Sequence, residues 1–254
     1  MEMPKNLFKQ ALRDGQAQIG LWCSIAGSDN AEALAGCGFD WMLIDTEHST
    51  VDLTTVKAML QAAAPYRTQT VVRPGWNDAV EIKRLLDAGA MSVLVPYVQT
   101  AAEAARAVSA VRYAPQGTRG VAGITRASRY GAVDGYLARA NDEICLLVQV
   151  ETVEALTNIE AIAAVDGVDG IFVGPADLAA SMGFPGNTAA PEVKAAILDA
   201  IARIRACGKP AGILSLDPDF LQQAVAAGSV FTAVDVDQAI LLRGARALVQ
   251  QWKG

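Results

Sequence analysis

The residues of this chain that could do chemistry near neutral pH begin with one histidine. His48 is the only histidine, and it follows an apolar run that ends in Asp45, with Glu47 directly before it. Imidazole is the side chain whose ordinary pKa lies closest to physiological pH. His48 is therefore the one general-base candidate that needs no pKa shift, and the alternative is a lone histidine in a surface loop.

Two acidic residues farther along the chain have surroundings that suit a metal ion. Glu151 ends an apolar run, and Asp177 follows a Gly-Pro-Ala turn. Two carboxylates from neighbouring strands are the minimal protein share of a magnesium-type site that leaves positions for water and substrate. Gln149 could hold a metal-bound water. A structural interpretation fits equally well: Asp177 would cap a helix, and Glu151 would lie in the first turn of another.

A permanent cation and a group of backbone amides complete the candidate site. Arg73 precedes a Pro-Gly pair and can present its guanidinium to an anionic group or a developing oxyanion. A structural salt bridge to Glu151 or Asp45 is the alternative. The backbone N–H groups around Ala176 and Asp177, at a helix start, suit a carboxylate. Together these parts fit a 2-oxo acid chelated by a metal ion, with Arg73 stabilising its enolate.

Short apolar runs alternate along the chain with alanine-rich stretches of helical spacing. The eight predicted strands are Ile19–Ser24, Trp41–Asp45, Thr70–Arg73, Ser92–Pro96, Ile144–Val150, Gly170–Val173, Ala211–Leu214 and Val230–Val234. Strands that alternate with helices imply parallel pairing, because each strand must return to the same sheet edge through a crossover. Eight such units in 254 residues predict one (β/α)8 TIM-barrel domain over residues 1–254.

The barrel would bring the candidate residues to one rim, because chemistry in this fold occurs at the carboxyl ends of the strands. His48, Arg73, Glu151 and Asp177 all follow or end predicted strands. A helix over Asn6–Asp14 is predicted to close the opposite end of the barrel.

The main irregularity is the connection between Val98 and Ile144. A helix over Ala101–Val111 leads into a long loop, and a connection of that length is usually functional or interfacial. Its arginines are Arg112, Arg119, Arg126 and Arg129. They could bind anions or belong to a solvated, mobile loop, and the sequence favours neither interpretation.

Composition excludes several classes of protein. The chain is 52% hydrophobic with a net charge of -6, so it can bury a large core but lacks the clustered Lys and Arg of a nucleic-acid or anionic-membrane surface. No apolar run is long enough to span a bilayer and no leader is recognisable, which predicts a cytoplasmic protein. The four cysteines form no C-x-x-C pair, so we expect reduced thiols. No organic cofactor is expected.

Seven segments of the chain carry a family resemblance in combination. They are Gln18-Ile-Gly-Leu-Trp22, Phe39-Asp-Trp-Met-Leu-Ile-Asp-Thr-Glu-His48, Val72-Arg-Pro-Gly-Trp-Asn-Asp78, Leu85-Leu-Asp-Ala-Gly89, Arg119-Gly-Val, Gln149-Val-Glu151 and Val173-Gly-Pro-Ala-Asp-Leu178. The chain resembles, from about Asn6 to Leu248, the class II pyruvate aldolases of the HpcH/HpaI family, which includes 4-hydroxy-2-oxoheptanedioate and 2-keto-3-deoxy-sugar-acid aldolases.

The resemblance implies a metal-dependent barrel of the phosphoenolpyruvate/pyruvate superfamily. The metal would be Mg2+, Mn2+ or Co2+, all of which two carboxylates and waters accept. The chain would assemble as a homo-hexamer, a trimer of dimers, with the C-terminal helix exchanged between subunits.

Roles for single residues also come from the resemblance. Glu151 and Asp177 would hold the metal ion, Arg73 would contact the pyruvate oxygen, and His48 would act in proton transfer. The substrate-binding residues are expected to be Arg73, Gln149, Gly174, Pro175, Ala176, Asp177, Trp22 and Leu214. Trp22 would line the aldehyde side of the pocket, and the alternative is that it belongs to the core.

Two carboxylates compete for the role of orienting His48. The resemblance implies Asp87, contributed by an adjacent subunit, whereas the sequence alone suggests Asp45, three residues before His48. Both stay open, because an imidazole has two nitrogens and either carboxylate could fix its tautomer.

These assignments predict reversible cleavage of a 4-hydroxy-2-oxo acid to pyruvate and an aldehyde through an enolate of pyruvate held by the metal ion. His48, or a water that it polarises, would take the C4 hydroxyl proton. A Schiff-base route is disfavoured, because no lysine lies at the carboxyl end of a predicted strand. The near alternative is an oxaloacetate decarboxylase or related 2-oxo acid lyase on the same site, and the distant one is a catalytically silent barrel.

Overall fold

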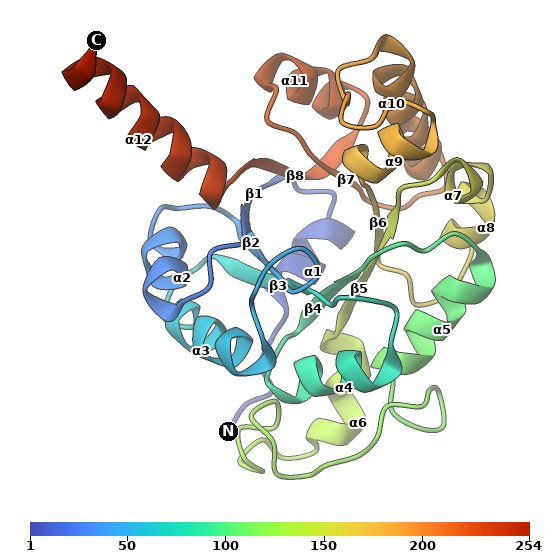
Figure 1. Ribbon diagram of the computed structural model, residues 1–254. Helices are drawn as coiled ribbons and strands as arrows, with labels where there is room; N and C mark the ends of the chain where they lie inside the picture. The colour runs from blue at the N-terminus through green and yellow to red at the C-terminus, as the bar shows by residue number, and fades with distance from the viewer.

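A closed barrel of eight parallel strands forms the centre of the protein. The computed structural model describes residues 1–254, and its strands pair in sequence order, with β8 returning to β1 (Figure 1). The strands are β1 (Gln18–Cys23), β2 (Trp41–Asp45), β3 (Gln69–Arg73), β4 (Ser92–Val95), β5 (Cys145–Val150), β6 (Gly170–Val173), β7 (Ala211–Leu214) and β8 (Ser229–Val236). Every strand end lies within two residues of its predicted position. The predicted (β/α)8 barrel is confirmed.

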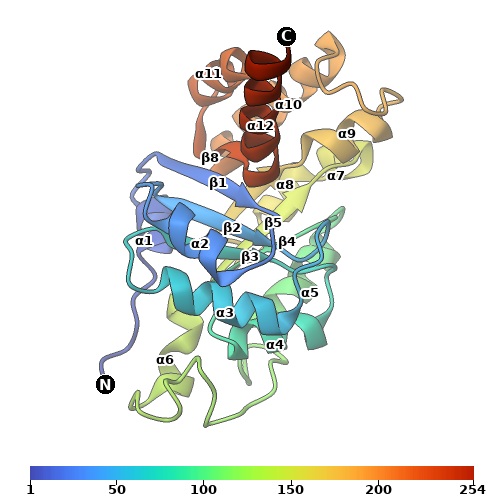
Figure 2. The same ribbon diagram turned by 60° about the vertical axis from the view of Figure 1, so that its left-hand side comes forward.

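Helices surround the barrel and connect its strands (Figures 1 and 2). They are α1 (Leu7–Arg13), α2 (Ser28–Ala35), α3 (Leu53–Ala63), α4 (Ala79–Asp87), α5 (Ala101–Val111), α6 (Tyr136–Glu143), α7 (Val153–Thr157), α8 (Ile159–Ala163), α9 (Pro175–Ser181), α10 (Pro191–Ala206), α11 (Pro218–Ala226) and α12 (Asp237–Lys253). Capping residues set their ends. For α4, the Asp78 carboxylate accepts hydrogen bonds from the backbone N–H groups of Val80 and Glu81, and Gly89 follows the last turn with a φ of +104°,.

The barrel interior changes from apolar to polar along the strands. Alternate residues of a strand point to the same face, and Leu43 and Val71 belong to the buried cluster inside the barrel. Two residues farther along, Asp45 and Arg73 take the next inward positions of β2 and β3, and Gln149 does the same on β5. The pleat of the strands therefore places charged and polar side chains inside the carboxyl end of the barrel.

Helix α1 closes the opposite end, as predicted. The Phe8 ring is fully buried, with its centroid 5.7 Å from that of Trp41 and 6.1 Å from that of Phe231. Both partners lie near the starts of their strands. The amino-terminal end of the barrel is thus filled with aromatic rings, which leaves the carboxyl end as the open one.

The segment between α5 and β5 contains more regular structure than the sequence analysis predicted. It contains a helix, α6, that the sequence analysis did not predict, and the N-terminal residues run beside this helix in both views (Figures 1 and 2). Lys5 Nζ lies 2.5 Å from Glu143 Oε1 at the end of α6. The N-terminus and α6 therefore support one another.

Three of the four arginines in that segment bind other parts of the protein. Arg119 is buried and donates to Asp87 at 2.9 Å, Arg112 lies 3.0 Å from Asp166, and Arg126 donates to a backbone carbonyl of the α4 end at 3.0 Å. Their guanidinium groups serve tertiary structure, and the suggested anion-binding role gains no support from these contacts.

Helix α12 projects away from the barrel and carries the C-terminus at its tip (Figure 1). Only its first residue, Asp237, is buried, and the Asp237 carboxylate accepts hydrogen bonds from the backbone N–H groups of Ser24 and Ile25 at 3.0 Å each. The rest of α12 exposes large apolar side chains, including Leu241 at 61% and Trp252 at 80%. None of the helices has the length and apolar character that crossing a membrane requires.

Candidate active site

A buried ion pair between β2 and β3 is the most constrained part of the rim. Asp45 and Arg73 face each other in register, and Arg73 donates to the two carboxylate oxygens from Nε at 2.9 Å and Nη2 at 2.7 Å. The Trp22 Nε1–H donates to Asp45 at 3.2 Å, and the guanidinium carbon of Arg73 lies 4.9 Å from the Trp22 ring centroid. Of the salt bridges suggested for Arg73, the one to Asp45 is present.

Arg73 keeps Asp45 ionised. Burial alone would raise the pKa of the Asp45 carboxyl, but hydrogen bonds and charge from Arg73 outweigh burial and hold that pKa below its usual value,. The oxygens of Asp45 also face the backbone N–H of His48, at a long 3.5 Å. Asp45 thus contacts the backbone of His48 and not its imidazole, so its suggested role in orienting the ring is not seen within one chain.

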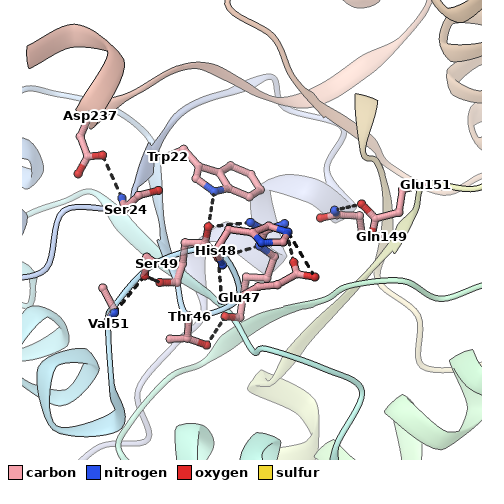
Figure 3. A network of polar contacts seen from close by, with 12 residues as sticks. Trp22, Ser24, Thr46, Glu47, His48, Ser49, Val51, Gln149, Glu151 and Asp237 are labelled. Atoms are coloured by element: carbon pink, nitrogen blue, oxygen red, sulfur yellow. Dashed lines mark hydrogen bonds and ion pairs between the residues drawn. The ribbon is translucent and has the colours of Figure 1, made fainter. Parts of the chain in front are cut away.

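Glu47 is a site residue that the sequence analysis gave no role. Its Oε2 lies 2.7 Å from Arg73 Nη1, and its Oε1 lies 3.8 Å from His48 Nε2. Burial raises the pKa of Glu47 and outweighs the lowering effect of the charges of Arg73 and His48, while Asp45 and Asp177 add to the increase. The position of Glu47 between Asp45 and His48 in the sequence could have indicated that it belongs to the site. Figure 3 shows Glu47 and His48 in the same part of the site as Trp22, with Gln149 and Glu151 across from them.

His48 stands at the open side of this group. Its side chain is 65% exposed, so the imidazole is accessible to a substrate entering the barrel mouth. The other proposed orienting residue, Asp87, lies at the far end of α4 and is paired with Arg119 at 2.9 Å. Asp87 therefore does not meet His48 of its own chain, and its contribution from an adjacent subunit stays a prediction.

Glu151 is held by hydrogen bonds on the opposite side of the barrel mouth. The backbone N–H of Tyr97 donates to its Oε1 at 2.8 Å, and Gln149 Nε2 donates to its Oε2 at 2.5 Å. Tyr97 has a φ of 57°, a left-handed conformation that residues other than glycine seldom adopt. The Oε1 of Gln149 is buried without a hydrogen-bond partner, which leaves an acceptor beside the carboxylate.

Burial shifts the protonation of Glu151 strongly. It raises the pKa of Glu151 to about 7, and the charges of Asp177 and Glu47 act in the same direction. Gly174 is required beside it, because a Cβ at that position would lie 2.4 Å from Glu151 Oε2. The glycine allows the turn after β6 to pass directly over this carboxylate.

The structural alternatives for the two predicted metal ligands do not hold. Helix α9 begins at Pro175 with Gly174 as its N-cap residue, so Asp177 lies in the first turn and not at the cap. Helix α7 begins after its N-cap Thr152, so Glu151 precedes that helix. Capping therefore explains neither carboxylate.

The remaining predicted substrate residues fall into two environments. Trp22 is 4% exposed and packs inside the barrel, which matches the core alternative. Pro175, Ala176 and Leu214 line a cavity of about 440 Å³. Three of the proposed substrate-binding residues are thus brought together around a space that can hold a small molecule.

The donor set at the rim suits a divalent cation with a preference for oxygen ligands. Glu151, Asp177 and Gln149 offer only oxygen acceptors. No three His, Cys, Asp or Glu side chains of the chain come together as a metal-ligand cluster. A metal ion here would therefore complete its coordination with water or substrate oxygens.

Comparisons with known proteins agree with this arrangement. The family model described as HpcH/HpaI aldolase/citrate lyase matches residues 18–243. The chain is 60% identical to a hydroxypyruvate/pyruvate aldolase of Sagittula stellata, over 99% of this chain and 100% of that protein. It is 53% identical to a 4-hydroxy-2-oxo-heptane-1,7-dioate aldolase of Salmonella heidelberg, over 98% of this chain and 95% of that protein.

A solved structure agrees at the level of the fold. A crystal structure of an HpcH/HpaI aldolase/citrate lyase family protein from Burkholderia cenocepacia matches with a TM-score of 0.94 and 38% identity, over 98% of this chain and 100% of that one. The family model and the relatives that match along nearly the whole chain define a lyase of the aldolase class. The chain belongs to the HpcH/HpaI aldolase/citrate lyase family, which confirms the family and enzyme class predicted from the sequence.

The raised pKa of Glu151 predicts a pH-dependent stability of the metal-free protein. Below about pH 4.5 the carboxyl is protonated in the folded and unfolded states, so it costs nothing. Between the ordinary value of 4.5 and about 7, only the unfolded state ionises, and stability falls by about 3 kcal/mol in total. We expect Glu151→Gln to gain stability relative to wild type between pH 5 and pH 8, measured by urea unfolding in EDTA. An equal pH dependence of the two proteins would contradict the burial argument.

Proposed function

We propose that the protein is a metal-dependent aldolase that reversibly cleaves 4-hydroxy-2-oxo acids to pyruvate and an aldehyde. The observation that carries the proposal is a buried, hydrogen-bonded Glu151 that lies across the barrel mouth from Glu47 and His48 (Figure 3), in a chain 60% identical to a hydroxypyruvate/pyruvate aldolase. The Salmonella relative is named for a dioate, which is itself a 4-hydroxy-2-oxo acid.

A divalent metal ion, Mg2+, Mn2+ or Co2+, is proposed to bind to Glu151 and Asp177. Two observations support this proposal. The pKa of Glu151 is raised, and a nearby dication would favour its ionised form. The Oε1 of Gln149 has no hydrogen-bond partner and can accept a hydrogen bond from a metal-bound water. When bound, the ion would act as a Lewis acid on the keto oxygen of the substrate.

The side chains of the protein would bind the 2-oxo acid and move the proton. Arg73 presents a fixed positive charge toward the keto oxygen, where negative charge develops as the carbon–carbon bond breaks. The backbone N–H groups of Ala176 and Asp177, at the start of α9, would take the carboxylate. His48 accepts the C4 hydroxyl proton in cleavage and returns it in synthesis.

The protein is proposed to be a cytoplasmic homo-oligomer, a hexamer built as a trimer of dimers. The support is α12, whose apolar side chains lie exposed on a helix that projects from the barrel (Figure 1). Exchange of this helix between subunits would bury those side chains, and the adjacent subunit would then supply Asp87.

Deuterium exchange at the methyl group of pyruvate tests enolate formation without knowledge of the aldehyde. We expect rapid exchange with Mn2+ or Mg2+ and its loss in EDTA, followed by NMR in D2O. Asp177→Asn should slow exchange more than about 100-fold, because it removes a metal ligand. Glu154→Gln, a similar change at an exposed position of α7, should behave as wild type. A slow exchange that EDTA does not affect would remove the aldolase assignment.

Replacement of His48 tests the proton-transfer step. Because the side chain is largely exposed, His48→Asn should fold as wild type, while the kcat of aldol cleavage should fall by about 10²- to 10⁴-fold. Steady-state release of pyruvate and the circular dichroism of both proteins provide the measurement. A wild-type kcat would show that another group moves the proton.

Charge placed on α12 tests the assembly. Leu241→Glu together with Leu248→Glu should dissociate the oligomer, because both side chains are more than half exposed in one chain and would be desolvated between subunits. Light scattering after size exclusion measures the mass. An unchanged mass would show that α12 does not form the interface.

A further inference from the structure

A cavity extends from the rim between the ends of β6, β7 and β8 and the helices outside them. Its volume is about 440 Å³, and it begins at Pro175 and Ala176, next to the proposed metal ligand Asp177. Leu214, Phe220 and Val236 form much of its lining. The cavity is therefore an apolar extension of the site, on the side where the second product of an aldol cleavage could lie.

Only two charged residues line this cavity, and they neutralise each other. Lys194 Nζ lies 2.8 Å from Asp217 Oδ2 and 5.0 Å from the centroid of the Phe220 ring. The hydrogen bond from Lys194 is the main cause of a lowered pKa of Asp217. The other oxygen of Asp217 accepts from the backbone N–H groups of Asp219 and Phe220 at 3.1 Å each, so the carboxylate is fixed at the start of α11.

The geometry points to this cavity as an aldehyde subsite that selects uncharged aldehydes, with the Lys194–Asp217 pair as its selectivity determinant. The inference rests on the proposed aldolase function. Lys194 is the only positively charged residue that lines the cavity, and its ammonium group is already paired with Asp217. A carboxylated aldehyde would have to displace Asp217 from Lys194 or lie beside the negative charge of Asp217.

A preference for uncharged aldehydes would distinguish this chain from relatives named for a dioate substrate. Cleavage of a 4-hydroxy-2-oxo-heptane-1,7-dioate between C3 and C4 leaves pyruvate and a four-carbon aldehyde with a terminal carboxylate. The hydroxyl groups of Thr188 and Ser215, which also line the cavity, can hydrogen-bond a hydroxylated aldehyde but cannot neutralise a carboxylate. The preferred partner of pyruvate is therefore a short aldehyde without a charge.

Butanal and succinic semialdehyde provide a matched test, because both have four carbons and differ in the terminal carboxylate. We expect the wild-type enzyme with Mn2+ and pyruvate to show a kcat/KM at least tenfold higher for butanal. Asp217→Asn keeps an acceptor for the helix cap but frees Lys194, and should shift the ratio at least tenfold toward succinic semialdehyde. Lys194→Met leaves Asp217 unpaired and should shift it the other way.

Asp219→Asn is the control, since it makes the same change of charge on α11 at an exposed residue outside the cavity. Its ratio should equal that of wild type. Preference of the wild type for succinic semialdehyde, or an unchanged ratio in Asp217→Asn, would overturn the inference. If pyruvate still exchanges its methyl protons in those cases, only the subsite is wrong. If exchange is absent, the proposed function fails and the subsite falls with it.

Discussion

The burial of one guanidinium group inside the barrel constrains everything else at the rim. A charge removed from water must be paired and hydrogen-bonded, and Arg73 meets this demand with Asp45 and Glu47,. Removing one partner of such a buried pair typically costs about 3–5 kcal/mol. The bidentate contact with Asp45 fixes the plane of the guanidinium, and the Trp22 ring beneath it prevents retreat into the core. The guanidinium group of Arg73 is therefore held in a position from which it can act only on a molecule in the barrel mouth.

The acidic residues that surround Arg73 exceed what it can neutralise. Asp45 and Glu47 contact it directly. Glu151 and Asp177 are not paired with Arg73, and their charges act on Glu47 and on each other. The excess is visible in the raised pKa values of Glu47 and Glu151, for which burial is the first cause and neighbouring negative charge adds to it. The divalent cation proposed above would supply the missing positive charge, and the oxygen donors match such an ion. The electrostatic imbalance and the proposed metal site are thus one feature of the structure.

How far the sequence predicted this arrangement depends on the type of contact. The strands were located closely, because apolar runs that alternate with alanine-rich helices leave few other folds. Asp45, Arg73 and Gln149 could be placed because they follow buried residues at the two-residue period of a strand. The backbone N–H of Tyr97 could not, since Tyr97 lies in the loop after β4 and is 54 positions from Glu151 in the chain. The pairing of Arg119 with Asp87 joins α4 to a distant loop, and no local pattern encodes it.

The rim divides into two halves that are built from different forces. The half on β2, β3 and β5 is held by buried charges and hydrogen bonds, each of which satisfies another, so a change at Asp45 or Glu151 leaves a partner unpaired,. The half on β6 to β8 is lined mainly by apolar side chains around an open cavity, with Lys194 and Asp217 as its one ion pair. Substitutions in the half on β2, β3 and β5 would disturb the residues proposed for the reaction. Substitutions in the half on β6 to β8 would instead change which aldehyde the protein accepts. With the aldehyde in the proposed subsite, this separation would account for relatives that bear names for different substrates while sharing more than half of their residues with this chain.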